Sequence, residues 1–275
     1  MKWQVCHGET MSKDVFFRTL SEQCYVHVPF KVPHGAVDLA VAAFFRFLQA
    51  PAAIKTHIDF SIAPLHRRGD VGYKHRLATD DIYNDDKEFF HYHPAIESHY
   101  ADFLCENPVV ADLIQCARPL WDATATTVRE TLTRFEKHSP GIVNRVFDTT
   151  NPHILLRFLK YDWTDSGRNL AKPHFDAGSC TLAIAESTQG LRIGRDADTL
   201  SLVNHRPGQA IFMFSSNYRQ LLQNDAFQPG WHDVIQIDDT LKGRPFSRWA
   251  IVAFIEAHGV KALSRNETHK WALNG

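Results

Sequence analysis

The chain has no excess of charge of either sign. Its 275 residues include 30 Lys and Arg and 31 Asp and Glu, so the formal net charge is −1. Nucleic-acid-binding surfaces usually show a clustered excess of Lys and Arg, and disordered tails usually contain blocks of like charge. Neither pattern is present, so we expect no nucleic-acid partner.

Cysteine is scarce and irregularly placed. The five cysteines form no CxxC pair; they are Cys6, Cys24, Cys105, Cys116 and Cys180. An odd number without regular spacing argues against a disulfide framework or a thiolate zinc site and is typical of a reducing compartment. The first residues, "MKWQVCHGETMSKD", also lack the apolar region of a signal peptide. We therefore expect a cytoplasmic protein.

Long hydrophobic runs are absent as well. The most apolar helical segment, "VDLAVAAFFRFL", is shorter than a membrane span and contains Asp38 and Arg46. We therefore expect no membrane association. The chain is 44% hydrophobic, which is enough for a large core, and it has no internal repeat or linker. These features predict a single domain over residues 1–275, and nothing in the sequence sets an oligomeric state.

The pattern changes near residue 140. Residues 1–140 are predicted to be mainly helical, with helices at 12–23, 37–48 and 108–137, and with a short strand at "YVHVPF". Pro119 indicates a kink or a break in the third helix. Residues 141–275 show short apolar segments between glycines, which predict strands at 154–163, 180–187, 191–195, 199–204, 209–215, 232–238 and 247–257. The predicted fold class is a β-rich α+β protein, with a double-stranded β-helix (jelly roll) core and an N-terminal helical layer.

One short stretch, "KPHFDAGSCTLAI", suggests a metal site. On extended backbone, His174 and Asp176 share a face, and the apolar segment after them is typical of a strand. His232, in "PGWHDVIQI", opens another strand-like segment and is the candidate third ligand. Two histidines and one carboxylate form the facial triad of non-haem Fe(II) oxygenases, which leaves coordination positions open for co-substrate and O₂.

The residues around these ligands resemble a known family. "HFDAGSCTLAIAESTQGLRIG", "PGQAIFMFSSNYRQLLQNDAF" and "SRWAI" are similar to the core motifs of the isopenicillin N synthase-like family of Fe(II)/2-oxoglutarate-dependent dioxygenases. "DDKEFFHYHP" and "YVHVPFKVPHGAVDLAVAAFFRFL" resemble more loosely the segments that precede the core in that family.

The resemblance implies roles for particular residues. His174, Asp176 and His232 match the iron ligands. Arg248 matches the arginine that binds the distal carboxylate of 2-oxoglutarate, and Tyr161 matches a tyrosine that assists it. A guanidinium suits this role because its planar fork meets a carboxylate with two parallel hydrogen bonds.

The chain departs from the family motif beside this arginine. Ala250 stands where the motif has serine, and Leu159 stands where many members have asparagine. Arg248 also lies farther beyond the distal histidine than usual, so Arg244 is an alternative anchor. Ser247 does not replace the serine, because neighbouring residues of a strand face opposite sides.

Two further groups attract attention. Arg67, Arg68, Lys74 and Arg76 form a basic cluster in a region that borders the substrate site in the family, so they are candidate substrate-binding residues. His91 and His93, in "HYHP", have the donor atoms for zinc, but we expect them to lie at the surface or at the edge of the site.

These observations predict an Fe(II)- and 2-oxoglutarate-dependent oxygenase that uses O₂. It would act on a C–H bond of a small molecule, such as an amino acid or a natural-product intermediate, by hydroxylation, desaturation or cyclisation. One alternative is an Fe(II)-dependent oxidase or cyclase that needs no 2-oxoglutarate, like isopenicillin N synthase. A second is a non-catalytic jelly-roll binding or sensor protein.

Overall fold

The computed structural model describes residues 12–62, 70–77, 86–149, 151–222 and 227–260. The helices are α1 (Lys13–Gln23), α2 (Ala36–Leu48), α3 (Ala52–Lys55), α4 (Ala95–His99), α5 (Ala101–Glu106), α6 (Pro108–Thr133), α7 (Ile142–Phe147) and α8 (Tyr218–Leu222). The strands are β1 (Val26–Pro29), β2 (Asp59–Ser61), β3 (Asp70–Arg76), β4 (Lys87–Tyr92), β5 (Ile154–Tyr161), β6 (Asn169–His174), β7 (Cys180–Glu186), β8 (Leu191–Gly194), β9 (Ser201–Leu202), β10 (Gln209–Phe214), β11 (Trp231–Ile235) and β12 (Arg248–Ile255).

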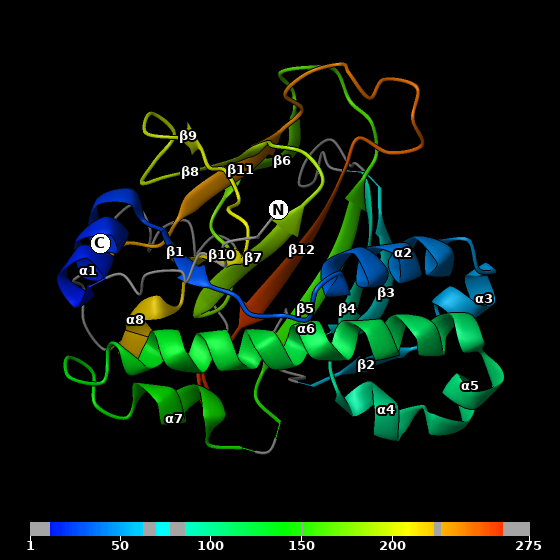
Figure 1. Cartoon of the computed structure of the whole chain (residues 1–275), viewed down its shortest axis with the longest axis horizontal. Coiled ribbons are helices and arrows are strands. Elements are labelled where there is room, and N and C mark those ends of the chain that lie inside the picture. The colour runs from blue at the N-terminus through cyan, green and yellow to red at the C-terminus, as the bar shows by residue number, and fades with distance from the viewer. Residues whose placement is uncertain (1–11, 63–69, 78–85, 150, 223–226, 261–275) are drawn as a thin grey trace, which may run out of the picture.

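The strands form two antiparallel sheets that face each other (Figure 1). The large sheet has the order β1-β10-β7-β12-β5-β4-β3-β2, and the small sheet has the order β6-β11-β8-β9. Side chains from both sheets meet between them, including Leu159, Leu191 and Val234. This arrangement is the predicted jelly roll. It follows from the period of two in each strand, which sends alternate residues to opposite faces.

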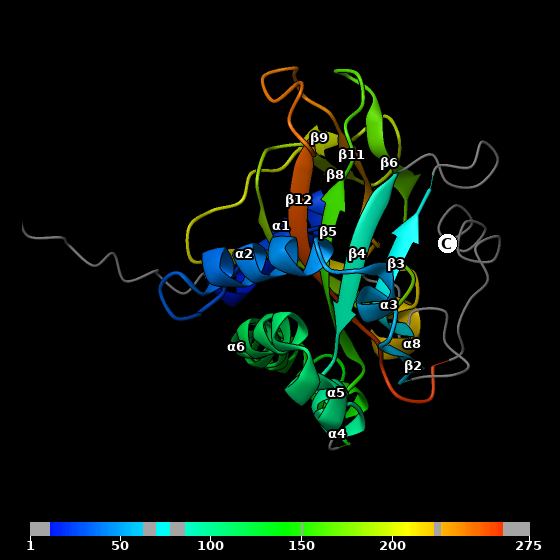
Figure 2. The same cartoon turned by 90° about the vertical axis from the view of Figure 1, so that its right-hand side faces the viewer.

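The outer face of the large sheet is covered by helices (Figure 2). In β12, Ile251 and Ala253 belong to the core shared with the helices, whereas Ala250 and Val252, which alternate with them, pack in the interior of the jelly roll. Phe44 of α2 and Leu113 of α6 lie in that same outer core. The helical layer and the sheet are therefore stabilised together by apolar burial.

The N-terminal part contains more strand than its sequence pattern predicts. β2, β3 and β4 are not predicted, yet they extend the large sheet beyond β5. β2 forms the edge of the sheet and is only partly buried, and charged residues of β3 and β4 such as Lys74 and Glu88 form ion pairs, so these segments lack the apolar pattern that predicts a strand.

Helix α6 is continuous, so the predicted break or kink at Pro119 does not divide it. Pro119 and Gln115 are both exposed. The carbonyl of Gln115, which loses its intrahelical partner to the proline, therefore lies on the solvent side, where water can hydrogen-bond to it.

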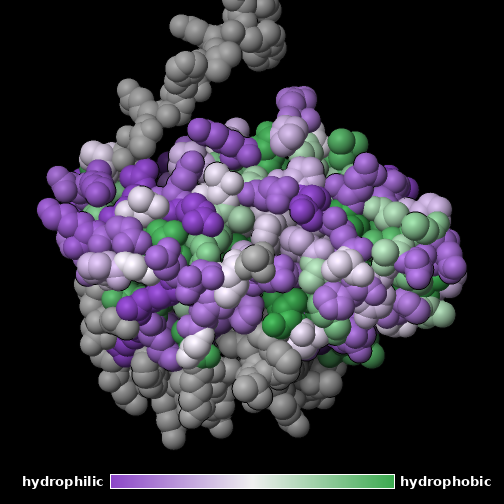
Figure 3. Space-filling view, turned by 90° about the horizontal axis from the view of Figure 1, so that it is seen from below, coloured by the Kyte–Doolittle hydropathy of each residue, from purple (hydrophilic) through white to green (hydrophobic). Residues whose placement is uncertain are grey.

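The surface seen from below is mostly hydrophilic, with small separate hydrophobic areas (Figure 3). Among the helices that the structure describes, none is long and apolar enough to cross a membrane.

Candidate active site

Three predicted ligands come together at one end of the jelly roll. His174 is the last residue of β6 and His232 is the second residue of β11, and the two residues are cross-strand partners. Asp176 follows β6 by two residues. The candidate ligand atoms of the three side chains all lie within 4.8 Å of one another, and they form the one such group that the described residues contain.

Both imidazoles have a defined orientation. Nδ1 of His174 lies 2.6 Å from the carbonyl oxygen of Lys172, and Nδ1 of His232 lies 3.0 Å from that of Gly230. A carbonyl oxygen only accepts, so Nδ1 carries the hydrogen and Nε2 of the neutral ring keeps its lone pair. The Nε2 atoms lie 3.6 Å and 3.5 Å from the two carboxylate oxygens of Asp176. Two nitrogen lone pairs and a carboxylate thus converge on one point, which fits a divalent metal.

Asp176 does not lie on the strand, which differs from the prediction that both residues of the His-x-Asp pair are on extended backbone. It lies in the β6–β7 loop, and the hydroxyl of Thr181 donates a 2.9 Å hydrogen bond to its Oδ2. The amide of Ser216 donates to its carbonyl oxygen at 3.0 Å. The aspartate is therefore placed by contacts to β7 and to the loop after β10.

A buried carboxylate, Glu256, contacts both the β6–β7 loop and the segment after β10. Its two oxygens accept hydrogen bonds from the Ser179 hydroxyl at 2.5 Å and from the Asn217 amide at 3.1 Å. Gly178, which precedes Ser179, has a φ of +120°, and a Cβ there would meet the carbonyl oxygen of Ile255 at 3.2 Å. Sequence reasoning does not identify Thr181 or Glu256; the only signal was a polar residue within an apolar segment.

The predicted co-substrate residues lie on the interior face of the large sheet. Arg248 of β12 is the cross-strand partner of Tyr161 of β5, which in turn pairs with Lys87 of β4. Cross-strand partners share a face. All three residues are buried, at 3%, 5% and 5% exposure. The Arg248 guanidinium carbon lies 5.8 Å from the centre of the Tyr161 ring.

Arg248 is already engaged within the chain. Its Nη2 forms an ion pair with Oε2 of Glu186, the last residue of β7, and its Nε donates to the carbonyl of Thr188 at 3.1 Å. The other oxygen of Glu186 lies 3.2 Å from Nδ1 of His205. Burial would raise the pKa of the Glu186 carboxyl, but His205 and Arg248 outweigh it and hold the pKa below its usual range. Sequence reasoning missed Glu186, although an acidic residue closing an apolar strand was a visible signal.

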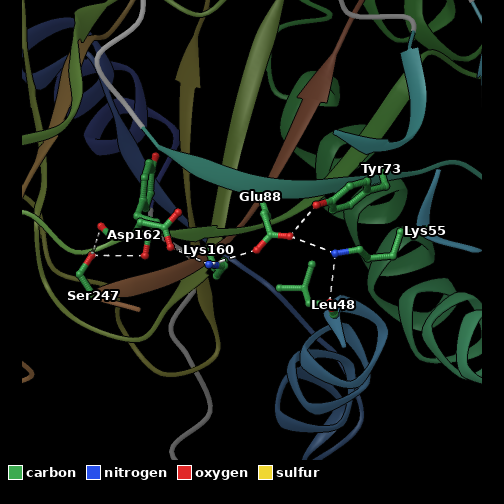
Figure 4. A network of polar contacts seen from close by, with 8 residues as sticks. Leu48, Lys55, Tyr73, Glu88, Lys160, Asp162 and Ser247 are labelled. Atoms are coloured by element: carbon green, nitrogen blue, oxygen red, sulfur yellow. Dashed lines mark hydrogen bonds and ion pairs between the residues drawn. The ribbon is translucent and has the colours of Figure 1, made fainter. Parts of the chain in front are cut away.

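The alternatives to Arg248 lie elsewhere. Arg244 is exposed in the β11–β12 connection. The Ser247 hydroxyl donates to the carbonyl of Asp162 at 3.0 Å, so it braces the backbone beside Arg248 (Figure 4).

The predicted substrate residues are only partly described. Arg67 and Arg68 lie outside the described residues. Lys74 and Arg76 are on β3, and Lys74 forms an exposed ion pair of 2.8 Å with Asp59. The guanidinium of Arg76 lies 5.8 Å from the centre of the Phe89 ring, which faces the interior.

His91 and His93 are buried, so a location at the protein surface is wrong for both. Nδ1 of His91 lies 2.6 Å from the carbonyl oxygen of Asp70, and its Nε2 accepts from Arg157 Nε at 2.7 Å. His93 is bonded to backbone on both sides, and burial lowers its pKa to about 4. Neither ring directs a ligand atom toward a second metal.

Solved structures resemble this arrangement. T7H of Neurospora crassa, in complex with alpha-KG and thymine, matches with a TM-score of 0.64 at 12% identity, over 95% of this chain and 90% of that one. AtDAO1, the dioxygenase for auxin oxidation 1 of Arabidopsis thaliana, in a 2-oxoglutarate complex, matches with 0.63 at 13% identity, over 91% of each. JOX2, in complex with 2OG, Fe and JA, matches with 0.62 at 18% identity, over 92% and 75%.

No protein-family model and no curated protein sequence matches the chain. The structural likeness nevertheless shows that the chain has the fold of the Fe(II)/2-oxoglutarate-dependent oxygenases. The fold class expected from the sequence is thereby confirmed.

Proposed function

We propose that this protein is an Fe(II)- and 2-oxoglutarate-dependent oxygenase that oxidises a C–H bond of a small molecule. The observation that carries the proposal is the convergence of the His174 and His232 Nε2 atoms with the Asp176 carboxylate. The donor set is one that Fe(II) oxygenases use, and two of its three members are buried.

The residues around the site have separable tasks. His174, Asp176 and His232 would hold Fe(II), while Thr181 orients the carboxylate. Arg248 would bind the distal carboxylate of 2-oxoglutarate, with Tyr161 beside it. When bound, Fe(II) with 2-oxoglutarate supplies the activation of O₂ that breaks an unactivated C–H bond. The apolar residues between the sheets exclude water from that chemistry.

The substrate and setting form part of the same proposal. We expect a small molecule, such as an amino acid or natural-product intermediate, with Lys74 and Arg76 as candidate contacts near the edge of the large sheet. The whole chain would act as one domain, because helices and sheet share a core. Four cysteines are free among the described residues, which suits the reducing cytoplasm.

The ion pair between Glu186 and Arg248 supports a second candidate function. Because Arg248 already pairs with a carboxylate of its own chain, the protein does not need a 2-oxoglutarate carboxylate to neutralise it. Ala250 and Leu159 also remove two polar partners that the family motif supplies. An Fe(II)-dependent oxidase without 2-oxoglutarate fits these features.

An anaerobic titration distinguishes the two. Fe(II)-loaded protein is titrated with 2-oxoglutarate while the visible metal-to-ligand charge-transfer band is followed. We expect a saturable band, and we expect Arg248→Ala to weaken the apparent affinity by about tenfold or more, since it removes a charged hydrogen-bonding partner. Bound iron with no band, at any concentration tested, would instead favour the oxidase.

A further inference from the structure

The charges near Arg248 are unusual for a site that receives a dianionic co-substrate. The described side chains there that carry or can carry charge include Lys87, Glu186, His205 and Arg248. Glu186 and Arg248 are both almost fully buried, with side-chain exposures of 5% and 4%. A buried guanidinium paired with a buried carboxylate is close to neutral as a unit. Arg248 therefore offers an incoming carboxylate much less attraction than an unpaired arginine would.

The hydrogen-bonding capacity of Arg248 is also partly used. A guanidinium has five N–H donors, one on Nε and two on each terminal nitrogen. Nε donates to Thr188 and Nη2 faces Glu186. Within the described part of the chain, no hydrogen bond is found for Nη1. One edge of the guanidinium is thus taken by the protein, and the other edge is where a ligand carboxylate would bind.

Glu186 has a second partner that can share its charge. Its Oε1 lies 3.2 Å from His205 Nδ1, on the opposite side from Arg248. The carboxylate therefore lies between the Arg248 guanidinium and the His205 imidazole, which come from different parts of the chain. A ligand carboxylate that reaches Arg248 competes with Glu186 for the guanidinium. The Glu186 carboxylate then depends more on its contact with His205.

From these contacts we infer that Glu186 is an affinity- and specificity-determining residue of the co-substrate site. It acts as an internal counter-carboxylate on Arg248, and it weakens the binding of 2-oxo acids that have a charged distal end. This inference rests on the proposed function. It assigns a role to a residue that is not one of the predicted metal ligands.

The test compares two 2-oxo acids on the same protein. Fe(II)-loaded, anaerobic wild type, Glu186→Gln and Glu186→Ala are titrated with 2-oxoglutarate and with 2-oxobutanoate, whose distal end is an uncharged methyl group. The charge-transfer band reports equilibrium binding and requires no turnover. We expect both variants to bind 2-oxoglutarate about tenfold more tightly than wild type, because a like charge is removed from its neighbourhood. The affinity for 2-oxobutanoate should stay within about twofold, since its methyl end carries no charge to be repelled.

Glu88→Gln is the matched control. Glu88 is also a part-buried carboxylate held by cations, but its partners are Lys55 and Lys160 and it lies one residue from Lys87, on the opposite face of β4. This variant should leave both affinities unchanged.

His205→Gln provides a test in the opposite direction and keeps Glu186 in place. Loss of His205 leaves the carboxylate to Arg248 alone, so 2-oxoglutarate should bind more weakly.

The outcomes separate the inference from the function on which it rests. If 2-oxoglutarate binds Glu186→Ala more weakly than wild type, Glu186 only positions Arg248 and the inference is overturned. Equal tightening for both 2-oxo acids, or tighter binding in His205→Gln, also overturns it. A band that forms at lower 2-oxoglutarate concentrations after Glu186 is neutralised, with the 2-oxobutanoate titration unchanged, supports the inference. Iron binding with no band for either acid in any variant contradicts the proposed function itself.

Discussion

At the scale of single residues, the metal site depends on contacts one step away from the ligands. Two backbone carbonyls fix the ring orientation of His174 and His232, and a threonine fixes the carboxylate of Asp176. Such outer contacts hold the lone pairs in place before a metal arrives, which reduces the entropy lost on binding.

Thr181→Val should lower Fe(II) affinity by about tenfold, because the substitution keeps the shape of the side chain and removes the hydroxyl that bonds to Asp176 and to the Ser215 hydroxyl. His232→Ala, which removes a ligand, should lower it much further. A competition titration against a chelator measures both. Thr124→Val is the control, since Thr124 is equally buried but bonds within α6 to the carbonyl of Leu120. Wild-type affinity in Thr181→Val would show that Thr181 does not orient the carboxylate.

At the scale of elements, α6 illustrates how tertiary packing overrides a local signal. A proline in a helix interior removes one hydrogen bond and crowds the preceding turn. In α6 the buried stripe from Val110 to Leu132 runs on both sides of Pro119 and is packed against α2 and the sheet. Apolar burial along the helix therefore outweighs the local cost.

Pro119→Ala should raise the free energy of unfolding by about 1–2 kcal/mol, because the new N–H can bond to the carbonyl of Gln115, while the unfolded chain gains some freedom. Pro108→Ala is the matched control. Pro108 is at the first helical position, where an N–H has no intrahelical partner, so little change is expected. Urea denaturation of the two variants checks the difference; equal stabilities would contradict the argument.

At the scale of the whole molecule, a charged network joins the helical layer to the large sheet (Figure 4). Glu88 of β4 contacts the ammonium groups of Lys55 at 3.3 Å and Lys160 at 3.1 Å, and it accepts from the Tyr73 hydroxyl at 2.5 Å. Lys55 also donates to the carbonyl of Leu48 at the end of α2. Burial would raise the pKa of Glu88, but Tyr73, Lys160 and Lys55 outweigh it, and its pKa is lowered from 4.5.

This shift sets the expected dependence of stability on pH. A carboxyl whose pKa is lower in the folded state stabilises the fold above its unfolded pKa, and this contribution is lost as the pH falls through the folded pKa. Glu88→Gln should therefore cost about 1–3 kcal/mol at pH 7, and the gap to wild type should narrow below the ordinary pKa of 4.5. Denaturation at several pH values measures the gap.

Asp112→Asn is the control for that experiment. Asp112 pairs with Arg46 at 3.0 Å, but both side chains are more than half exposed. An exposed pair contributes little, so its removal should change stability by less than about 1 kcal/mol at any of these pH values. A pH-independent gap for Glu88→Gln would contradict the assigned role of its charge.

The sequence by itself determined which residues could be metal ligands and roughly where the C-terminal strands lie. His174, Asp176 and His232 could be chosen because each stands beside a strand-like segment, and short apolar segments between glycines predicted seven strands close to where β5 and β7 to β12 lie. These signals are local, since each lies within one short segment of the chain.

Only the tertiary structure decided how the predicted site residues are held in place and which other residues they contact. Asp176 is placed by Thr181 and Ser216 and not by its own strand, and Arg248 meets Glu186 from 62 positions away. Which charges share a buried space depends on the register between strands that are distant in the chain. That register is set by the packing of both sheets together, so no single segment of the sequence encodes it.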